Sequence, residues 1–171
     1  MGVEQLQGAD AIEQLIRLHA AEVHRYLSKL TAGDRVLTED LVQDVFVTLA
    51  SQRLDNGVER LGLPWLLTVA RSRFVDHVRS ATARARREKR DHQASPVLDV
   101  PVDALVVSGE QARWMLSRLP DAERWALALA VVDGMPVDEL ADVLGRSVDA
   151  THSLLARGRR RLRSIMEGDL Q

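Results

Sequence analysis

Arginines gather near the C-terminus of this chain, directly after a stretch with the spacing of two short helices. Within seven residues the sequence has five of them: Arg157, Arg159, Arg160, Arg161 and Arg163. A guanidinium stays positively charged at physiological pH and can donate paired hydrogen bonds to a phosphate. The chemistry that this cluster indicates is therefore the binding of a polyanion.

The elements that must position these arginines are two helices joined by a glycine turn. Leu140, Val143 and Leu144 form an apolar stripe on the first helix, and Gly145 can adopt the positive φ angle of a tight turn. Ser147 is a suitable N-cap for the second helix. That helix repeats core-type residues at helical spacing: Val148, Thr151, Leu155 and Leu162. The pattern predicts a helix-turn-helix, whose second helix can enter the major groove of DNA.

Charge is unevenly distributed along the chain. The 171 residues have a net charge of −2, yet residues 51–90 carry a net +6 and residues 143–171 a net +3, and acidic segments separate them. Two basic segments suggest two anion-binding surfaces, with DNA as the obvious common ligand. For either segment alone, a solvated arginine-rich helix is the alternative.

Catalytic and metal-binding patterns are missing from the sequence. The five histidines are scattered, cysteine is absent, and no HExxH, glycine-rich phosphate loop or GxSxG occurs. The longest apolar run, Trp125–Val132, is far too short to span a membrane, and the N-terminus lacks the features of a signal peptide. We therefore expect a cytoplasmic protein without membrane insertion that is not an enzyme and binds no cofactor or metal.

The chain as a whole is predicted to be all-α. Residues 91–104 contain two prolines, scattered acids and weak periodicity, which is typical of a linker. We therefore predict two small helical domains, residues 1–90 and 105–171, joined by a flexible linker at 91–104. In the first domain we expect helices over Ala11–Leu30, from a cap at Thr38 to about Gln52, and from Pro64 to about Arg90, with a turn at Thr31–Asp34 and a loop at Arg53–Leu63.

The helix from Pro64 brings a tryptophan close to several arginines. Trp65 falls on the opposite side from the stripe that we expect to be buried, which consists of Leu63, Leu67, Ala70, Phe74 and Val78. The flat face of a tryptophan can stack on an unpaired base while nearby arginines hold phosphates. Packing of Trp65 against a neighbouring helix is the alternative.

Three motifs, in order along the chain, resemble those of extracytoplasmic-function sigma factors, the small promoter-recognition subunits of bacterial RNA polymerase. Thr38–Phe46, with the sequence TEDLVQDVF, is similar to the acidic motif of the family's second conserved region. Pro64–Arg79, PWLLTVARSRFVDHVR, is similar to the adjoining promoter-melting motif, and Leu119-Pro120 precedes the helix-turn-helix as in the fourth region. The chain departs from the usual pattern at Ser72, His152 and Leu154, where the family often has asparagine, a basic residue and arginine.

The resemblance implies a role for each motif. Residues 1–90 would bind core polymerase and open the minus-ten element, and residues 105–171 would read the minus-thirty-five element. The implied partners are the β′ clamp helices and β subunit of the polymerase, promoter DNA, and an inhibitory anti-sigma factor. The residues carried over are Asp40, Gln43, Asp44 and Phe46 for polymerase; Asn56, Trp65, Arg71, Arg73 and Arg79 for minus-ten DNA; and Asp149, His152, Ser153, Arg157, Arg159 and Arg160 for minus-thirty-five DNA.

The second helix of the predicted helix-turn-helix should turn Asp149, His152, Ser153 and Ala156 away from its core stripe.

Two alternative functions stay open. A helix-turn-helix transcriptional regulator would share this hairpin but would not need the other two motifs. A sigma-like adaptor would bind polymerase or an antagonist without reading DNA, which the departures at His152 and Leu154 allow. Phe46 is equally compatible with a place in the core.

Overall fold

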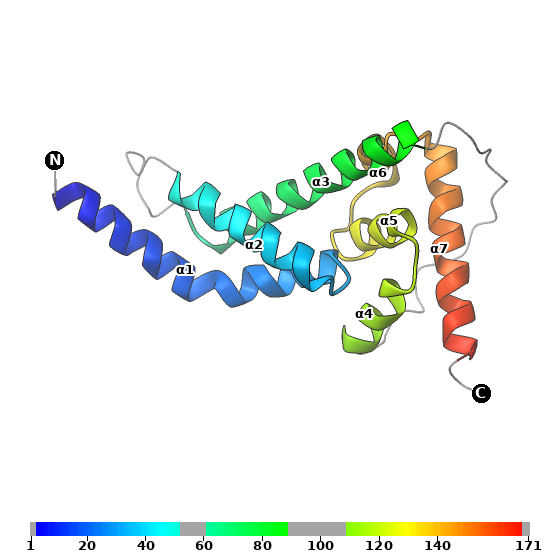
Figure 1. The fold of residues 1–171 in the computed structure, drawn as a ribbon, viewed down its shortest axis with the longest axis horizontal. Helices are drawn as coiled ribbons and strands as arrows, with labels where there is room; N and C mark the ends of the chain where they lie inside the picture. The colour runs from blue at the N-terminus through cyan, green and yellow to red at the C-terminus, as the bar shows by residue number, and fades with distance from the viewer. Residues whose placement is uncertain (1–2, 52–60, 89–108, 169–171) are drawn as a thin grey trace. The chain divides into compact units, whose positions relative to one another are not determined.

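The computed structural model describes residues 3–51, 61–88 and 109–168. These residues form seven helices and no strand, which confirms the all-α prediction for the described part of the chain (Figure 1). The helices are α1 (Val3–Leu30), α2 (Arg35–Ala50), α3 (Leu63–Glu88), α4 (Gly109–Ser117), α5 (Asp121–Val131), α6 (Val137–Leu144) and α7 (Val148–Gly168). Two features predicted from sequence, Asn56 and the linker at 91–104, lie outside the described residues.

Residue contacts divide the chain into two compact units. One consists of Met1–Ser28 with Arg35–Phe74, and the other of Lys29–Asp34 with Val75–Gln171. The division passes through α3, between Phe74 and Val75. The predicted domain limits at 90 and 105 therefore stay a prediction.

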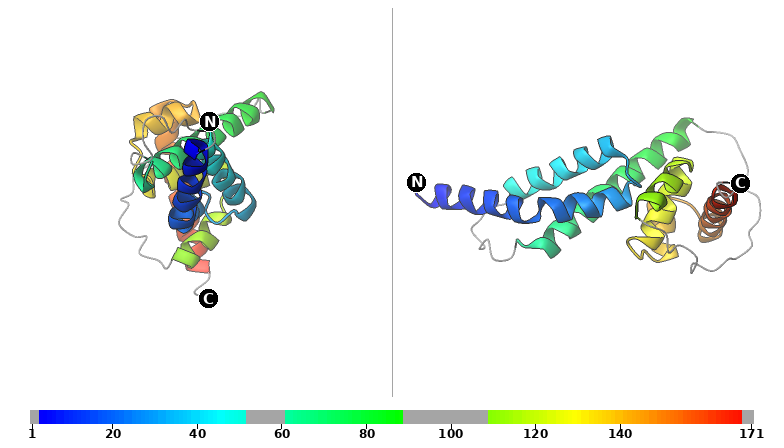
Figure 2. Two further views of the ribbon diagram at one scale, coloured as in Figure 1. Left: turned by 90° about the vertical axis from the view of Figure 1, so that its left-hand side faces the viewer. Right: turned by 90° about the horizontal axis from the view of Figure 1, so that it is seen from below.

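The first unit is built on α1 and α2, which run antiparallel and side by side (Figures 1 and 2). The turn at Thr31–Asp34 that joins them is as predicted, with Ala32 and Gly33 at positive φ angles of 56° and 81°. Helix α2 begins at Arg35, so the predicted cap at Thr38 is wrong: Thr38 lies inside the helix and is 1% exposed. The chain enters α2 directly from the turn, and Thr38 then falls on the buried face. The fully or nearly buried apolar residues of α1 and α2 in this unit are Val23, Leu27, Leu41, Val45 and Leu49.

Helix α3 buries a stripe that is rotated slightly from the predicted one. Ala70, Phe74 and Val78 are fully buried as expected, but Leu63 and Leu67 are only half-buried. Their place is taken by Leu66, which is 0% exposed. Residues 66, 70, 74 and 78 recur every four positions, so they follow one line along the helix.

The second unit contains α4 to α7, where α5, α6 and α7 contact one another and α4 contacts α7. The predicted helix-turn-helix lies in α6 and α7. Gly145 has a φ of 57° and ends α6, and its N–H donates to the carbonyls of Ala141 and Asp142. Ser147 caps α7 by accepting a hydrogen bond from the Ala150 N–H at 3.2 Å. Both predicted turn residues therefore have the predicted conformation or contact.

The core stripe of α7 is confirmed at three positions and corrected at three others. Thr151, Leu155 and Leu162 are buried, and Leu154 joins them at 1% exposed. Val148 is 44% exposed, because it is the first residue of the helix and lies beyond the packed surface. Ala156 was expected to face away from the core but is 8% exposed, because α5 and α6 together cover a wider arc of α7 than one stripe requires.

Candidate functional surfaces

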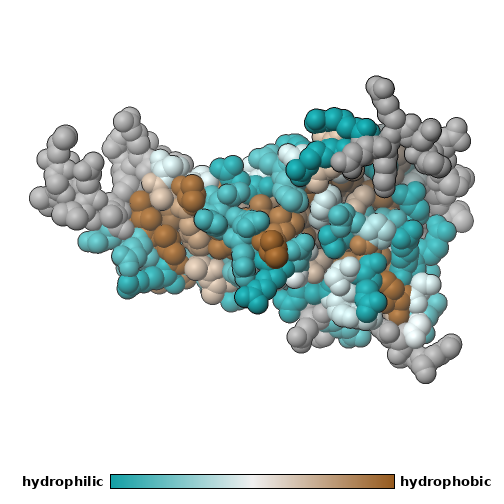
Figure 3. All heavy atoms as spheres, viewed as in Figure 1, coloured by the Kyte–Doolittle hydropathy of each residue, from teal (hydrophilic) through white to brown (hydrophobic). Residues whose placement is uncertain are grey.

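An acidic and polar face of α2 is exposed, and it carries three of the residues that the family resemblance assigned to polymerase. Asp40, Gln43 and Asp44 are all exposed, and Val47 on the same face is 59% exposed. Phe46 is half-buried, so it belongs neither fully to the core nor to this face. Figure 3 shows hydrophobic residues between hydrophilic ones over α1 and α2. This face, defined as Asp40, Gln43, Asp44 and Val47, offers acceptors for basic groups beside a small apolar contact.

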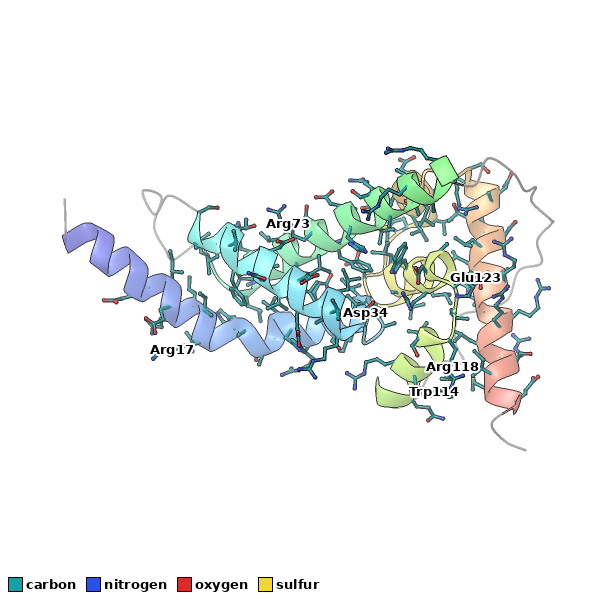
Figure 4. All side chains as sticks on the ribbon, in the orientation of Figure 1. Arg17, Asp34, Arg73, Trp114, Arg118 and Glu123 are labelled. Atoms are coloured by element: carbon teal, nitrogen blue, oxygen red, sulfur yellow. The ribbon has the colours of Figure 1, made fainter. Side chains whose placement is uncertain are left out.

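Helix α3 is tied to α2 next to that face. The Arg73 side chain donates a hydrogen bond from Nη2 to Thr48 Oγ1 at 2.8 Å, and Thr48 Oγ1 donates to the Asp44 carbonyl at 2.7 Å (Figure 4). Arg73 was predicted as a DNA contact. The structure places it across the α2–α3 packing, where it joins the two helices that carry the candidate surfaces of the first unit.

The other candidate residues of α3 are spread along the helix. Trp65 and Arg71 are half-buried, whereas Arg79 is exposed and lies 3.7 Å from the Asp76 carboxylate. At 100° per residue, Trp65 and Arg79 share one side of the helix, and 14 residues separate them by about 21 Å. The two side chains therefore lie on one side of α3 but far apart along its axis. Arg71 and Arg73 point to other sides, so the predicted arginines do not converge on one phosphate.

Helix α7 presents a polar surface beyond its core stripe. Asp149, His152 and Arg160 are exposed and Ser153 is half-buried, and all four fall within about 100° of the helix circumference. The Ser153 hydroxyl donates to the Asp149 carbonyl at 2.9 Å. In this rotamer the hydroxyl proton is already donated, so the Ser153 oxygen can only accept a hydrogen bond from a base. Leu154 is in the core, so the difference from the family's arginine at this position concerns packing.

The arginines of α7 lie on both flanks of that surface. Arg159 is half-buried on one flank, and Arg157 on the other is 3.5 Å from the carboxylate of Glu123 in α5. Loss of hydration, followed by the positive charges of Arg86 and Arg157, lowers the pKa of Arg146 in the turn before α7. Positive charge thus lies in the turn before α7 and on both flanks of its polar surface.

Sequence reasoning missed a further surface residue on α4. Trp114 is 40% exposed, and the Arg118 guanidinium lies 4.7 Å from the centroid of its ring (Figure 4). The spacing of four residues on a helix could have indicated this cation–π contact. Among the described residues no group of three or more His, Asp or Glu side chains could hold a metal ion, and no helix is long and apolar enough to cross a membrane.

Two family models match the chain, in the order expected from its motifs. Sigma-70 region 2 matches residues 15–84, which cover the α2 face and most of α3, and Sigma-70, region 4 matches residues 110–162, which cover α6 and most of α7.

Curated relatives match across most of the chain. The RNA polymerase sigma factor CarQ of Myxococcus xanthus is 29% identical over 95% of this chain and 92% of its own length. The ECF RNA polymerase sigma factor SigK of Mycolicibacterium vanbaalenii is 33% identical over 75% of this chain and 68% of its own length. A solved structure, the sigma factor RpoE in complex with the anti-sigma factor NepR from Bartonella quintana, is 20% identical, with a TM-score of 0.46, over 91% of this chain and 96% of that chain.

Proposed function

Because this chain belongs to the extracytoplasmic-function group of the sigma-70 family, it is a sigma factor that directs RNA polymerase to promoters, and we propose that its two regions divide that work between two promoter elements. Residues 1–90 bind core polymerase and open the minus-ten element, residues 105–171 read the minus-thirty-five element, and residues 91–104 connect them. The observation that carries this division is the presence of both sigma regions in order on one chain. Sigma factors are regulatory subunits rather than enzymes.

The α2 face is the proposed contact with the β′ clamp helices. Its exposed Asp40, Gln43 and Asp44 support this assignment, since charged and polar side chains without core contacts are available to a partner. Phe46, half-buried beside them, would supply apolar contact area. The β subunit is the other proposed polymerase contact of this chain.

The non-template strand at minus ten is the proposed ligand of α3. Trp65 would stack on an extruded base, and Arg71, Arg73 and Arg79 would bind phosphates along the strand. The spacing of Trp65 and Arg79 on one side of α3 supports an extended, single-stranded ligand. Asn56, in the segment before α3, is the proposed contact to a base edge.

Duplex DNA at minus thirty-five is the proposed ligand of α7. Asp149, His152 and Ser153 would face base edges, while Arg157, Arg159 and Arg160 would bind phosphates. The polar side of α7 supports this role, because it lies at the exposed N-terminal half of the second helix of a helix-turn-helix.

The proposed setting is a cytoplasmic stress or envelope response under the control of an anti-sigma factor. The inhibitor is implied by the family, in which an anti-sigma factor controls the sigma factor. In a pull-down from unstressed cells, we expect the chain to recover this inhibitor. Recovery of core polymerase alone would contradict that part of the proposal.

A transcription assay tests the central assignment. With core polymerase and a promoter selected by the holoenzyme from random DNA, we expect run-off transcript that depends on this chain. Asp40→Arg with Asp44→Arg should abolish co-elution with core polymerase, because like charges then face the basic partner surface.

A matched control reverses two other exposed acids. Asp10→Arg with Glu13→Arg on α1 makes the same change in net charge and should leave core binding intact. Unchanged helical circular dichroism would show that both variants fold. Normal core binding by the Asp40/Asp44 variant would refute the α2 assignment, whereas run-off without added chain would refute the sigma function.

A further inference from the structure

Glu123 is a buried carboxylate that faces the second helix of the helix-turn-helix. It lies in the first turn of α5 and is 4% exposed (Figure 4). Its Oε1 is 3.5 Å from Arg157 Nε, and its Oε2 is 3.4 Å from Arg161 Nε. Oε2 has no direct hydrogen-bond partner. A carboxylate in this position depends on the two arginines to offset its charge, since leaving it unpaired would cost several kcal/mol.

A glycine brings these groups together. Gly158 stands between Arg157 and Arg161 on α7, and a Cβ atom added to it would lie 2.9 Å from Leu127 Cδ1 and 3.4 Å from Glu123 Cβ. At its distance from α5, helix α7 leaves no room for a side chain at this position unless Leu127 shifts. The close approach places one arginine on either side of the buried carboxylate.

The contacts with Glu123 leave most of each guanidinium available. Both ion pairs use Nε, and a guanidinium has five N–H donors, four of them on its terminal nitrogens. The side chains of Arg157 and Arg161 are 43% and 56% exposed. Two positive charges against one negative charge also leave the group with a net charge of +1. A second anion can therefore bind at the exposed ends of the two arginines.

We propose that Glu123 is a positioning residue that holds Arg157 and Arg161 in place to bind phosphates of minus-thirty-five DNA. The proposal rests on the function assigned above to α7 and adds Arg161 as a DNA contact and Glu123 as its support. The two arginines are one helical turn apart, about 6 Å along the axis, so they can follow neighbouring phosphates of one strand. Holding them by Nε reduces the conformational freedom that they would otherwise lose on binding.

Two simpler roles for Glu123 give different expectations. If the ion pairs only stabilise the fold, Glu123 and Arg157 are coupled in the free energy of unfolding but independent in DNA binding. If Glu123 competes with phosphate for the arginines, removing its charge strengthens DNA binding. If Glu123 positions the arginines, loss of Glu123 weakens DNA binding. The effects of changing Glu123 and Arg157 on the DNA-binding constant are then coupled.

A double-mutant cycle in DNA binding separates these roles. The probe is a duplex selected from random-sequence DNA by the wild-type holoenzyme, and binding is measured by fluorescence anisotropy with full-length chain and core polymerase. Glu123→Gln, which keeps the shape of the side chain, should weaken binding about five-fold, a typical coupling for groups in contact. The factor by which Arg157→Ala weakens binding should then be about five times smaller in the Glu123→Gln background than in the wild type.

Arg160 supplies the matched control. It is exposed on α7, and no ion pair joins it to Glu123 among the described residues. Arg160→Ala should weaken binding by the same factor in both backgrounds. Equal effects of Arg157→Ala in the two backgrounds, or tighter binding by Glu123→Gln, would overturn the proposal.

Arg161→Ala tests the new contact and leaves Glu123 paired with Arg157. It should lower the slope of log affinity against log salt by about one unit, the change expected for one lost phosphate contact. An unchanged slope would overturn the contact. If the wild-type holoenzyme selects no duplex at all, the function assigned to α7 fails; if it selects one and the cycle shows no coupling, only the positioning role fails.

Discussion

Arg79 of α3 and two arginines of α7 are held in opposite ways. On α3, Arg79 pairs with Asp76 of the same helix at 3.7 Å, and both side chains are more than half exposed. On α7, Arg157 and Arg161 flank a carboxylate from another helix whose side chain is 6% exposed. The first pair is local and screened by water, whereas the second depends on the packing of α5 against α7.

This difference matches the two ligands that we propose. A melted strand changes shape as it is drawn out, so a loosely held arginine such as Arg79 can adjust to its phosphates. A duplex has a regular backbone, so arginines fixed on α7 lose less freedom when they meet it. The local environment of an arginine, and not only its charge, therefore decides whether it suits single-stranded or duplex DNA.

The largest expected effect concerns the single-stranded ligand. Trp65→Ala should reduce promoter opening about ten-fold or more, because stacking on a base contributes about 1–3 kcal/mol. Duplex binding should change by less than about two-fold, as for most surface substitutions. The measurements are permanganate reactivity of minus-ten thymines and a gel shift, both with reconstituted holoenzyme.

Trp65→Phe is the matched control, since it keeps an aromatic face and should retain most of the opening. If Trp65→Ala weakens duplex binding as much as it weakens opening, the proposed difference between the ligands of α3 and α7 is wrong. Normal opening by Trp65→Ala would make Trp65 a packing residue.

A smaller effect is expected from the packing that holds the α7 arginines. Gly158→Ala should destabilise the C-terminal region by about 1 kcal/mol, since overpacking costs about 1–3 kcal/mol and the better helix propensity of alanine returns part of it. Urea denaturation followed by circular dichroism measures the change. Gly168→Ala, at the end of the same helix with nothing within 4 Å of its added Cβ, is the control and should not destabilise. Equal stability of both variants would show that α7 does not need the close approach to α5.

The smallest effect is expected from the local pair on α3. Asp76→Ala should change the free energy of unfolding by less than about 0.5 kcal/mol, as is usual for an exposed ion pair. Promoter opening should be maintained, because Arg79 does not depend on Asp76 for its position. Urea denaturation and permanganate footprinting check the two parts. A loss of stability above about 1 kcal/mol would show that α3 holds Arg79 as firmly as α7 holds its arginines, against the comparison.

Sequence patterns were sufficient wherever one helix or one turn decides the outcome. The exposed α2 face follows from positions 40, 43, 44 and 47, and the turn of the helix-turn-helix from Gly145 and Ser147, since helical spacing and backbone conformation are local properties. Prediction was less accurate where a second helix sets the boundary of burial. Leu66 replaced Leu67 in the α3 core, and Ala156 proved buried on α7.

The sequence by itself determined the all-α class of the described residues, the order of the two sigma regions and the helix faces that carry the candidate contacts. Only the tertiary structure decided what Glu123 does. In the sequence it is an ordinary acid in the first turn of a helix, where the helix dipole is reason enough for its presence. Its pairing with Arg157 and Arg161 spans more than thirty residues and depends on Gly158 letting α7 approach α5. Contacts of this kind arise from packing between helices, which no periodicity within a single helix encodes.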